Sequence, residues 1–425
     1  MSARYPAMTK INVVKAQLGV ILILVVVYFL QVATPLRLHP DTVILLSVAE
    51  TAEQGGGYLY HEQPTVFPPG YPALMAFLIR VNLAHIWVIV SINVVFVVIG
   101  LLAVRYIFVS TGESESSVLG VCILSLLSFV FIKYSAIPLT DTFFFGVSMG
   151  CLALMKKAVS SPLDWRRLIA IVVLVIASVC IRRIGVALIP ALLYTVIFPS
   201  NRGLYLRLSV GSKATILLVA ASFGAAIVWV VRTTSTFMDF SSILRAHTAM
   251  DSALGILIFR LKELGEIAVN VPYVALPWMV QDSIPLIGIL AFALVFAGVA
   301  WRKERGVIET YFISYVALIL VWPFYDPRFW LPVIPFLIAY SGLALKRLAR
   351  AELATQILEG YVMMFVIVGL VTLASNTAVS YSVSRFADAY GAGQYHSTYC
   401  AVWHCSESDS AEVDLDALHL LHYYK

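Results

Sequence analysis

Charged residues are scarce in this sequence. Lys, Arg, Asp and Glu make up only 12% of its 425 residues, whereas 60% are hydrophobic, and the mean hydropathy is +0.90. A soluble domain cannot cover its surface with so few charges. The sequence also lacks internal repeats at a fixed period and low-complexity tracts, so one integral domain is the simplest description. The composition predicts a polytopic membrane protein of the all-α class.

Cysteine is rare as well. Three of the five cysteines lie in apolar runs, where they are expected to pack as inert residues: Cys122, Cys151 and Cys180. Cys400 and Cys405 lie in a polar segment, where an oxidising compartment would permit a disulfide. Two alternatives stay open: free thiols, and a metal site in which His396, Cys400 and His404 share one helical face. Their spacing matches no common zinc pattern.

Apolar runs recur along the chain, and a spanning helix needs roughly 20 mostly apolar residues. We predict about eleven spans, although adjacent short segments such as 168–181 and 184–198 leave the count open. The first run is long enough to span, which favours a retained anchor over a cleaved signal peptide. The predicted spans are 16–34, 86–109, 117–132, 139–155, 168–181, 184–198, 214–231, 284–300, 307–322, 330–345 and 360–378.

The positions of Lys and Arg predict the orientation, because cytoplasmic loops retain positive charge. With the N-terminus inside, more than half of the 29 basic residues lie in the cytoplasm, clustered at helix ends as in "WRKER" and "LKRLAR". The net charge of +5 follows from this topology and carries no prediction of nucleic-acid binding. We therefore predict a multi-pass membrane protein with its N-terminus inside.

Three polar segments then face outward. Residues 1–378 form the predicted transmembrane domain, which includes the first outer loop, 35–85, and a second outer loop, 232–282. Residues 379–425 form a short outer tail. Within the second loop, leucines recur at helical spacing from Leu254 to Leu264, with Arg260, Lys262 and Glu263 between them. This pattern predicts a helix lying in the outer membrane interface.

The first outer loop is unusually polar for a chain of this kind: "HPDTVILLSVAETAEQGGGYLYHEQPTVFPPGYP" covers residues 39–72. Asp41 opens an apolar segment that ends at a triple glycine, which predicts a short interfacial helix. The simplest role for Asp41 is an N-cap that accepts backbone N–H groups. The "FPPGYP" corner would then return the chain to the membrane, since Pro removes a donor and fixes φ.

More charges gather at the same outer level. Asp141 lies at the outer mouth of a predicted span, where an ionisable group is expensive and is therefore a functional candidate, although it could simply start a helix. Lys133, the adjacent Arg182 and Arg183, and Arg328 lie at this level too. Snorkelling into the headgroups explains Lys133 well but explains two adjacent arginines less well. A guanidinium also suits a phosphate, which it can bind through two parallel hydrogen bonds.

These motifs resemble the GT-C class of integral-membrane glycosyltransferases, particularly the branch of protein O-mannosyltransferases and bacterial lipid A aminoarabinose transferases. The resemblance lies in Asp41, the "PPGYP" corner from Pro68 to Pro72, Asp141, and "PRFWLPVIPF" from Pro327 to Phe336. It covers the N-terminal 200 residues best. The loop 232–282 and the tail 379–425 match nothing in the family, whose members often carry a larger outer C-terminal domain.

The resemblance implies transfer of a sugar from a polyprenyl-phosphate donor to a glycan, lipid or protein acceptor. It also implies a bacterial inner-membrane protein whose active site lies on the outer side. The acceptor hydroxyl must lose a proton as it attacks, and Asp41 is the predicted general base. The leaving phosphate needs cations more than an acid. The predicted phosphate-binding residues are Arg182, Arg183, Arg328 and Lys133. Such a single displacement inverts the anomeric centre.

Other roles stay more open. Asp141 could orient the acceptor or hold a divalent ion with Asp41, so the metal is unassigned and no cofactor is specified. Glu50 lies about two and a half helical turns past Asp41, on roughly the opposite face. The residues expected on the acceptor or sugar side are His39, Glu50, His61, Glu62 and Tyr71. The alternative function is a transporter or flippase for a lipid-linked glycan, which would need paired broken helices and related halves.

Overall fold

The computed structural model describes residues 8–65, 67–160, 165–197, 253–302, 306–348, 352–382, 386, 394–403 and 413–424. These residues are almost entirely helical, which confirms the all-α class, and one two-stranded hairpin interrupts the helices. The first half contains α1 (Met8–Leu30), η1 (Gln31–Ala33), α2 (Pro40–Glu53), β1 (Leu59–Tyr60), β2 (Gln63–Pro64), α3 (Gly70–Arg80), α4 (Ile86–Val109), α5 (Glu115–Leu126), α6 (Phe129–Ser135), α7 (Thr140–Ser160), α8 (Trp165–Ile181), η2 (Arg183–Ala187) and α9 (Leu188–Ile197).

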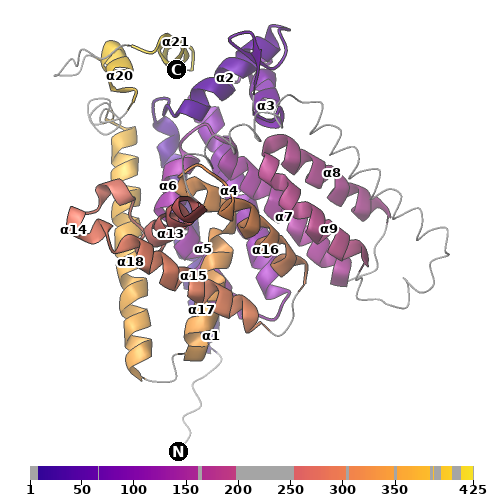
Figure 1. Ribbon diagram of the computed structural model, residues 1–425, viewed down its shortest axis with the longest axis vertical. Helices are drawn as coiled ribbons and strands as arrows, with labels where there is room; N and C mark the ends of the chain where they lie inside the picture. The colour runs from indigo at the N-terminus through magenta and orange to yellow at the C-terminus, as the bar shows by residue number, and fades with distance from the viewer. Residues whose placement is uncertain are drawn as a thin grey trace, which may run out of the picture.

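The second half begins with α13 (Ala253–Val269) and is helical throughout its described ranges. Its further elements are η3 (Tyr273–Ala275), α14 (Trp278–Gln281), α15 (Ile284–Ala300), α16 (Val307–Leu320), η4 (Pro327–Val333), α17 (Ile334–Leu348), α18 (Glu352–Ser380), α20 (His396–Trp403) and α21 (Leu415–Tyr423). α1 and α17 reach the bottom of Figure 1, whereas α2, α3, α20 and α21 lie at its top. The first outer loop and the tail therefore share one end of the molecule.

The chain is an integral membrane protein. Six stretches of described helix are long and apolar enough to cross a membrane: Asn12–Ala33, Ile86–Val109, Thr140–Ser160, Trp278–Ala300, Pro327–Leu348 and Leu358–Ser380. α5 and α6 together are also long and apolar enough to span, although they are bent by 57° where they meet. Counted as one broken span, they make a seventh.

The predicted count of eleven spans is not confirmed. The segments 184–198 and 307–322 form apolar helices shorter than 18 residues, and 214–231 lies outside the described residues.

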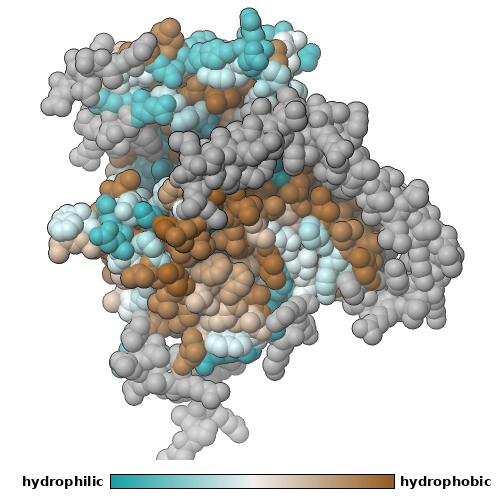
Figure 2. Space-filling view, in the orientation of Figure 1, coloured by the Kyte–Doolittle hydropathy of each residue, from teal (hydrophilic) through white to brown (hydrophobic). Residues whose placement is uncertain are grey.

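The surface supports this membrane assignment. On α1 and α18, side chains such as Leu22, Ile23, Met363 and Val371 are each more than 60% exposed. A contiguous apolar surface of this kind is unfavourable in water and suits a lipid environment. Figure 2 shows hydrophobic residues over the middle of the molecule and hydrophilic ones gathered at the top.

α4 and α7 share the most extensive helix–helix contact among the described elements. A Cβ atom at Gly146 would lie 2.6 Å from both the ring and the backbone carbonyl of Phe96, so only glycine permits this approach. Small residues commonly let membrane helices pack closely in this way. The packing fixes α7, and with it Asp141 in the first turn of that helix.

The tail packs onto the first outer loop. The hydroxyl of Tyr399 on α20 accepts a hydrogen bond from the backbone N–H of Leu38 at 2.6 Å. On α21, Asp416 accepts a hydrogen bond from the hydroxyl of Tyr60 at 2.9 Å. Ala417, Leu420 and Leu421 on α21 are buried. The tail predicted for residues 379–425 therefore covers the loop that carries Asp41.

The helix predicted in the second outer loop is present as α13, and two of its charged residues are buried in the protein. Arg260 and Glu263 are fully buried, whereas Leu254 is 64% exposed. The protein itself supplies the partners of Arg260 and Glu263, and exposed leucines such as Leu254 face outward. α13 is not among the stretches long and apolar enough to span.

Candidate active site

Asp41 lies at the start of α2, but it is not the N-cap. His39 is the cap: its Nδ1 accepts the backbone N–H of Asp41 at 3.2 Å, and Pro40 occupies the first helical position. The N-cap interpretation of Asp41 is therefore wrong. Its carboxylate instead forms an ion pair with the guanidinium of Arg328. The Asp41 side chain remains 26% exposed.

Asp141 forms the second pair, with Arg182. The Asp141 side chain is only 1% exposed, and its Oδ2 has no hydrogen-bond partner among the described residues. Arg182 follows the last residue of α8, and α3 packs against that end of the helix. A Cβ atom at Gly70 would lie 2.6 Å from the carbonyl oxygen of Cys180, so glycine in the "PPGYP" corner lets α3 approach. The corner thus helps to place Arg182.

Phe329 brings the two pairs together. The guanidinium carbon of Arg182 lies 5.6 Å from the centroid of its ring, and that of Arg328 lies 5.3 Å from it. These are cation–π distances. The backbone carbonyl of Phe329 accepts a hydrogen bond from the buried Tyr315 hydroxyl at 2.8 Å. This bond helps to hold Phe329 in place. The two arginines predicted to act together therefore converge on one aromatic side chain.

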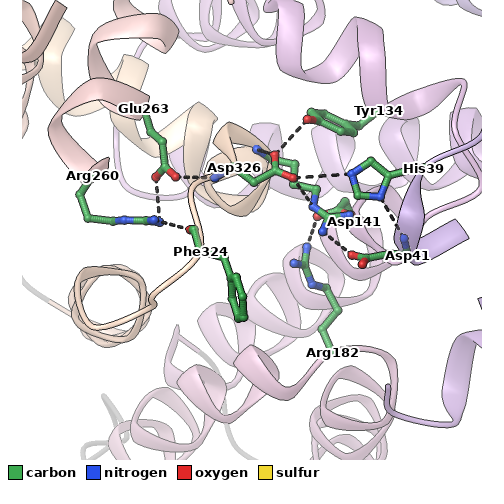
Figure 3. A network of polar contacts seen from close by, with 10 residues as sticks. His39, Asp41, Tyr134, Asp141, Arg182, Arg260, Glu263, Phe324 and Asp326 are labelled. Atoms are coloured by element: carbon green, nitrogen blue, oxygen red, sulfur yellow. Dashed lines mark hydrogen bonds and ion pairs between the residues drawn. The ribbon is translucent and has the colours of Figure 1, made fainter. Parts of the chain in front are cut away.

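Asp326 is a central residue of the site, and the sequence analysis missed it. Its Oδ2 lies 2.8 Å from Nε of Arg328 and 3.9 Å from Nε2 of His39. Its Oδ1 accepts the hydroxyl of the buried Tyr134 at 2.9 Å and the backbone N–H of Arg328 at 3.0 Å. The local signal was available, because an Asp-Pro-Arg sequence starts η4 with a capping carboxylate. Figure 3 shows how these side chains meet.

We call His39, Asp41, Asp141, Arg182, Asp326 and Arg328 the charged cluster. Because Nδ1 of His39 accepts a hydrogen bond, the proton of the neutral ring is on Nε2, the atom that faces Asp326. Burial, and then the charge of Arg328, lower the pKa of His39 from 6.5. With His39 neutral, the three carboxylates exceed the two guanidiniums by one negative charge.

The other two predicted phosphate ligands, Lys133 and Arg183, are each adjacent in sequence to a residue of the site or to one that contacts it. Lys133 is exposed on α6, with its Nζ 5.1 Å from the ring centroid of Tyr134, the residue that donates to Asp326. Arg183 follows Arg182 directly and begins η2. The phosphate-binding role of both residues stays a prediction.

The residues expected on the acceptor side do not come together. Glu50 pairs with His419 on α21 at 2.9 Å, and His61 pairs with Asp416 at 2.8 Å. Burial raises the pKa of Glu50, opposed by its hydrogen bond to His419. These contacts join the loop to the tail rather than to the charged cluster. The acceptor role of Glu50 and His61 stays a prediction.

Glu62 and Tyr71 differ in environment. Residues 61 and 62 both have positive φ, 48° and 63°, as a two-residue type I′ hairpin turn requires between β1 and β2, and Glu62 is exposed there. Tyr71 is fully buried on α3, 6.4 Å from Phe143, and its hydroxyl has no hydrogen-bond partner among the described residues. Burial, and then the nearby charge of Asp141, raise the pKa of Tyr71. Of the two, Tyr71 is the residue close to the charged cluster.

Cys400 is disulfide-bonded, whereas Cys405 and His404 lie outside the described residues. The predicted pairing of Cys400 with Cys405 therefore stays a prediction. Within the described ranges, no group of three or more His, Cys, Asp or Glu side chains is arranged to hold a metal ion.

An apolar groove of about 660 Å³ lies between helices of the bundle. α5, α13, α15, α17 and α18 form its walls, with Leu264, Ile267, Leu290 and Phe365 among its lining residues. None of the charged cluster lines the groove. α13 contributes to both places, because Leu264 lines the groove while the preceding residue, Glu263, contacts the chain that carries Asp326.

The fold and the charged cluster define an integral membrane protein with a buried ionic site at one end. No family model and no curated protein matches the sequence. The structure is similar to ArnT from Cupriavidus metallidurans bound to undecaprenyl phosphate, at 14% identity and a TM-score of 0.49, over 94% of this chain and 70% of that chain. It is also similar to the archaeal oligosaccharyltransferase AglB from Archaeoglobus fulgidus in complex with an inhibitory peptide and a dolichol-phosphate, at 13% identity and a TM-score of 0.46, over 85% of this chain and 56% of that chain. Both are GT-C glycosyltransferases, the class that the sequence motifs resemble.

Proposed function

We propose that this protein is a membrane glycosyltransferase that moves a sugar from a polyprenyl-phosphate donor to an acceptor at the outer face of the membrane. The observation that carries the proposal is the charged cluster, in which an accessible carboxylate, Asp41, lies beside two arginines that converge on Phe329. Acid–base transfer and stabilisation of a leaving phosphate need these two kinds of group in one place.

Asp41 is the general base of this proposal. Its side chain is 26% exposed, against 1% for Asp141, so Asp41 is the carboxylate that an acceptor hydroxyl can reach. The ion pair with Arg328 orients the Asp41 carboxylate before the acceptor arrives. As the hydroxyl oxygen attacks the anomeric carbon, its proton passes to Asp41 and the bond to the lipid phosphate breaks. One displacement of this kind inverts the anomeric centre.

Arg182 and Arg328 bind the departing phosphate. A guanidinium has five N–H donors, and the contact of Arg182 with Asp141 involves only one terminal nitrogen. Other N–H groups of Arg182 can therefore bind a phosphate while its ion pair with Asp141 stays intact. A phosphate nevertheless adds negative charge to a cluster that already has one in excess. Lys133, Arg183 or a divalent cation arriving with the donor would offset that charge, and the metal stays unassigned.

The apolar groove suits a lipid-linked donor. It lies among helices that include the membrane-exposed α18, and its walls are largely aliphatic and aromatic. α13 links the two places, because Leu264 lines the groove and the adjacent Glu263 contacts the backbone of Asp326. Sugar, carrier length and acceptor stay open.

A transporter or flippase is the alternative. One observation favours it, the 57° bend between α5 and α6, because transporters bind substrates at broken helices. Such folds need a second broken helix in a related position. Among the described spans the α5–α6 pair is the one bent in this way, so the enzyme proposal has the stronger support.

Two measurements test the proposal. Mass spectrometry of lipid extracts from cells with and without the gene should show a sugar-loaded polyprenyl phosphate that accumulates when the gene is absent. In nanodiscs, Arg328→Lys and Arg182→Gln should weaken binding of undecaprenyl phosphate, whereas Arg80→Gln, at an exposed arginine of α3, should not. Unchanged lipid profiles, together with wild-type affinity in both site variants, would rule the proposal out.

A further inference from the structure

α13 presents three acidic or basic side chains to the chain segment that carries Asp326 and Arg328. Arg260, Glu263 and Glu266 are spaced three residues apart, so they lie on one side of the helix. All three are buried. Buried charges are costly and are retained where they have partners. The partners of Arg260 and Glu263 lie between Phe324 and Trp330 or on α13 itself, and Glu266 contacts Tyr325 as well as the backbone of Tyr273.

Glu263 makes the central contacts. Its Oε1 accepts the backbone N–H of Asp326 at 2.6 Å, and its Oε2 accepts the indole N–H of Trp330 at 2.7 Å. Arg260 lies 2.8 Å from the same Oε2 and also donates to the carbonyl of Phe324. One carboxylate therefore binds the chain on both sides of Arg328, as the left half of Figure 3 shows for the Asp326 side.

Glu266 adds a further contact in the same direction, since it accepts a hydrogen bond from the hydroxyl of Tyr325. α13 thus holds Phe324, Tyr325, Asp326 and Trp330. None of the three α13 side chains belongs to the charged cluster. The Glu263 carboxylate contacts the backbone N–H of Asp326 and not the Asp326 carboxylate.

We propose that Glu263 is the positioning residue that sets the geometry of Asp326 and Arg328, and through Arg328 that of Asp41. The catalytic meaning of this inference rests on the proposed function. The geometry requires a carboxylate at position 263, because both partners donate. A glutamine has one acceptor oxygen, and its NH₂ group would face an N–H donor. An aspartate keeps two acceptors but is one methylene shorter.

Protonation of Glu263 should disturb the contacts with Asp326 and Trp330 in the same way as the Glu263→Gln substitution. Burial raises the pKa of Glu263 to about 8, opposed by Arg260 and the Trp330 indole, with Asp326 and Tyr325 the other ionisable groups that face it. A protonated carboxyl has one oxygen that carries hydrogen and no longer accepts equally. Glu263→Gln should therefore remove a pH dependence as well as a contact.

The experiment compares structures of the wild type, Glu263→Gln and Glu263→Asp in nanodiscs, with Glu359→Gln, at an exposed glutamate of α18, as the matched control. We expect the segment 324–330 to shift and the Arg328–Asp41 pair to separate in Glu263→Gln, with partial recovery in Glu263→Asp and no change in the control. An intact Arg328–Asp41 pair in Glu263→Gln would overturn the proposal. If Glu263→Gln does not fold, Trp330→Phe, which removes one donor and keeps the carboxylate, should shift the same segment, and an unmoved segment would count against it.

Kinetics supply the second measurement. A displacement of about 1 Å at a reacting group lowers turnover by about 10²-fold, so kcat/KM for sugar transfer should fall by that order in Glu263→Gln and recover partly in Glu263→Asp. The wild-type rate should rise with pH up to about 8, whereas Glu263→Gln should lack this limb. Wild-type kinetics in Glu263→Gln would overturn the positioning role. An inactive wild type would instead refute the proposed function, while the structural comparison still decides whether Glu263 positions the cluster.

Discussion

Asp41 and Arg328 are 287 residues apart in the sequence and form an ion pair at the outer-loop end of the molecule. The pair joins the first outer loop to the chain before η4. His39 and Asp326 lie on its two sides, which ties α2 and η4 together a second time. A carboxylate held this way is oriented but still accessible, which is the condition for a base that receives a proton from an incoming hydroxyl.

The first prediction concerns Asp41→Asn. The amide keeps the size of the side chain and can still accept a hydrogen bond from Arg328, and the helix cap is unaffected because His39 provides it. An amide cannot take up the acceptor's proton. Sugar transfer should therefore fall by about 10²–10⁴-fold while the melting temperature in nanodiscs changes little.

Asp282→Asn, at an exposed aspartate next to α14, is the matched control and should transfer sugar normally. Near-normal transfer by Asp41→Asn would remove Asp41 from the chemistry.

A second prediction concerns Asp141 and Arg182. Arg182→Gln leaves the Asp141 carboxylate 1% exposed and without its cation, a change that typically costs about 3–5 kcal/mol. Asp141→Asn in the same chain removes the uncompensated charge and should restore part of the lost stability. Thermal unfolding of the two single variants and the double variant gives the coupling energy. Additive effects of the two substitutions would mean that the pair is not a functional unit of the fold.

The third prediction is the orientation in the membrane. Glu62 is exposed at the tip of the hairpin, and Arg347 is exposed at the far end of α17. With the N-terminus inside, an impermeant thiol reagent should label Glu62→Cys in intact cells and Arg347→Cys only after permeabilisation. The unmodified chain is the control for labelling of native cysteines. The reverse pattern would place the site on the cytoplasmic side and contradict the proposed outer-face reaction.

Much of the charged cluster was predictable because topology sorts charges by level. Asp41, Asp141, Arg182 and Arg328 each lie beside an apolar run on the side where the charge bias disfavours basic residues, so a common level follows from the positive-inside rule. The pairing does not follow. Which carboxylate meets which arginine depends on how α3 packs against α8 and where Phe329 lies, and no local pattern encodes these contacts.

The misses have physical causes too. Helical spacing shows that Arg260 and Glu263 share a face of α13, but it does not show whether that face meets water or protein. Here that face meets protein, since Glu263 accepts hydrogen bonds from Trp330 and from the Asp326 backbone. Glu50 lies on the same helix as Asp41 but pairs with His419 instead of Arg328. Its partner His419 is 369 residues away, beyond the reach of any local signal.

The last prediction concerns His39 and pH. Its folded-state pKa lies below 6.5, so below that pH the unfolded chain binds a proton that the folded chain does not. Stability contributed by neutral His39 is therefore complete above pH 6.5 and is lost as the pH falls toward the folded-state pKa. His39→Asn can still accept the Asp41 N–H as a cap but does not titrate. Below pH 6.5, the melting temperature of His39→Asn should therefore depend less on pH than that of the wild type.

His85→Asn is the control, because His85 is exposed before α4 and makes no side-chain cap contact. Its melting temperature should follow the wild-type pH profile. If His39→Asn and the wild type lose stability in parallel below pH 6.5, the proton is not excluded from His39, and the ring does not stay neutral between Asp41 and Asp326. Transfer should also fall as His39 becomes protonated, because a charged ring can no longer accept the Asp41 N–H that holds the base.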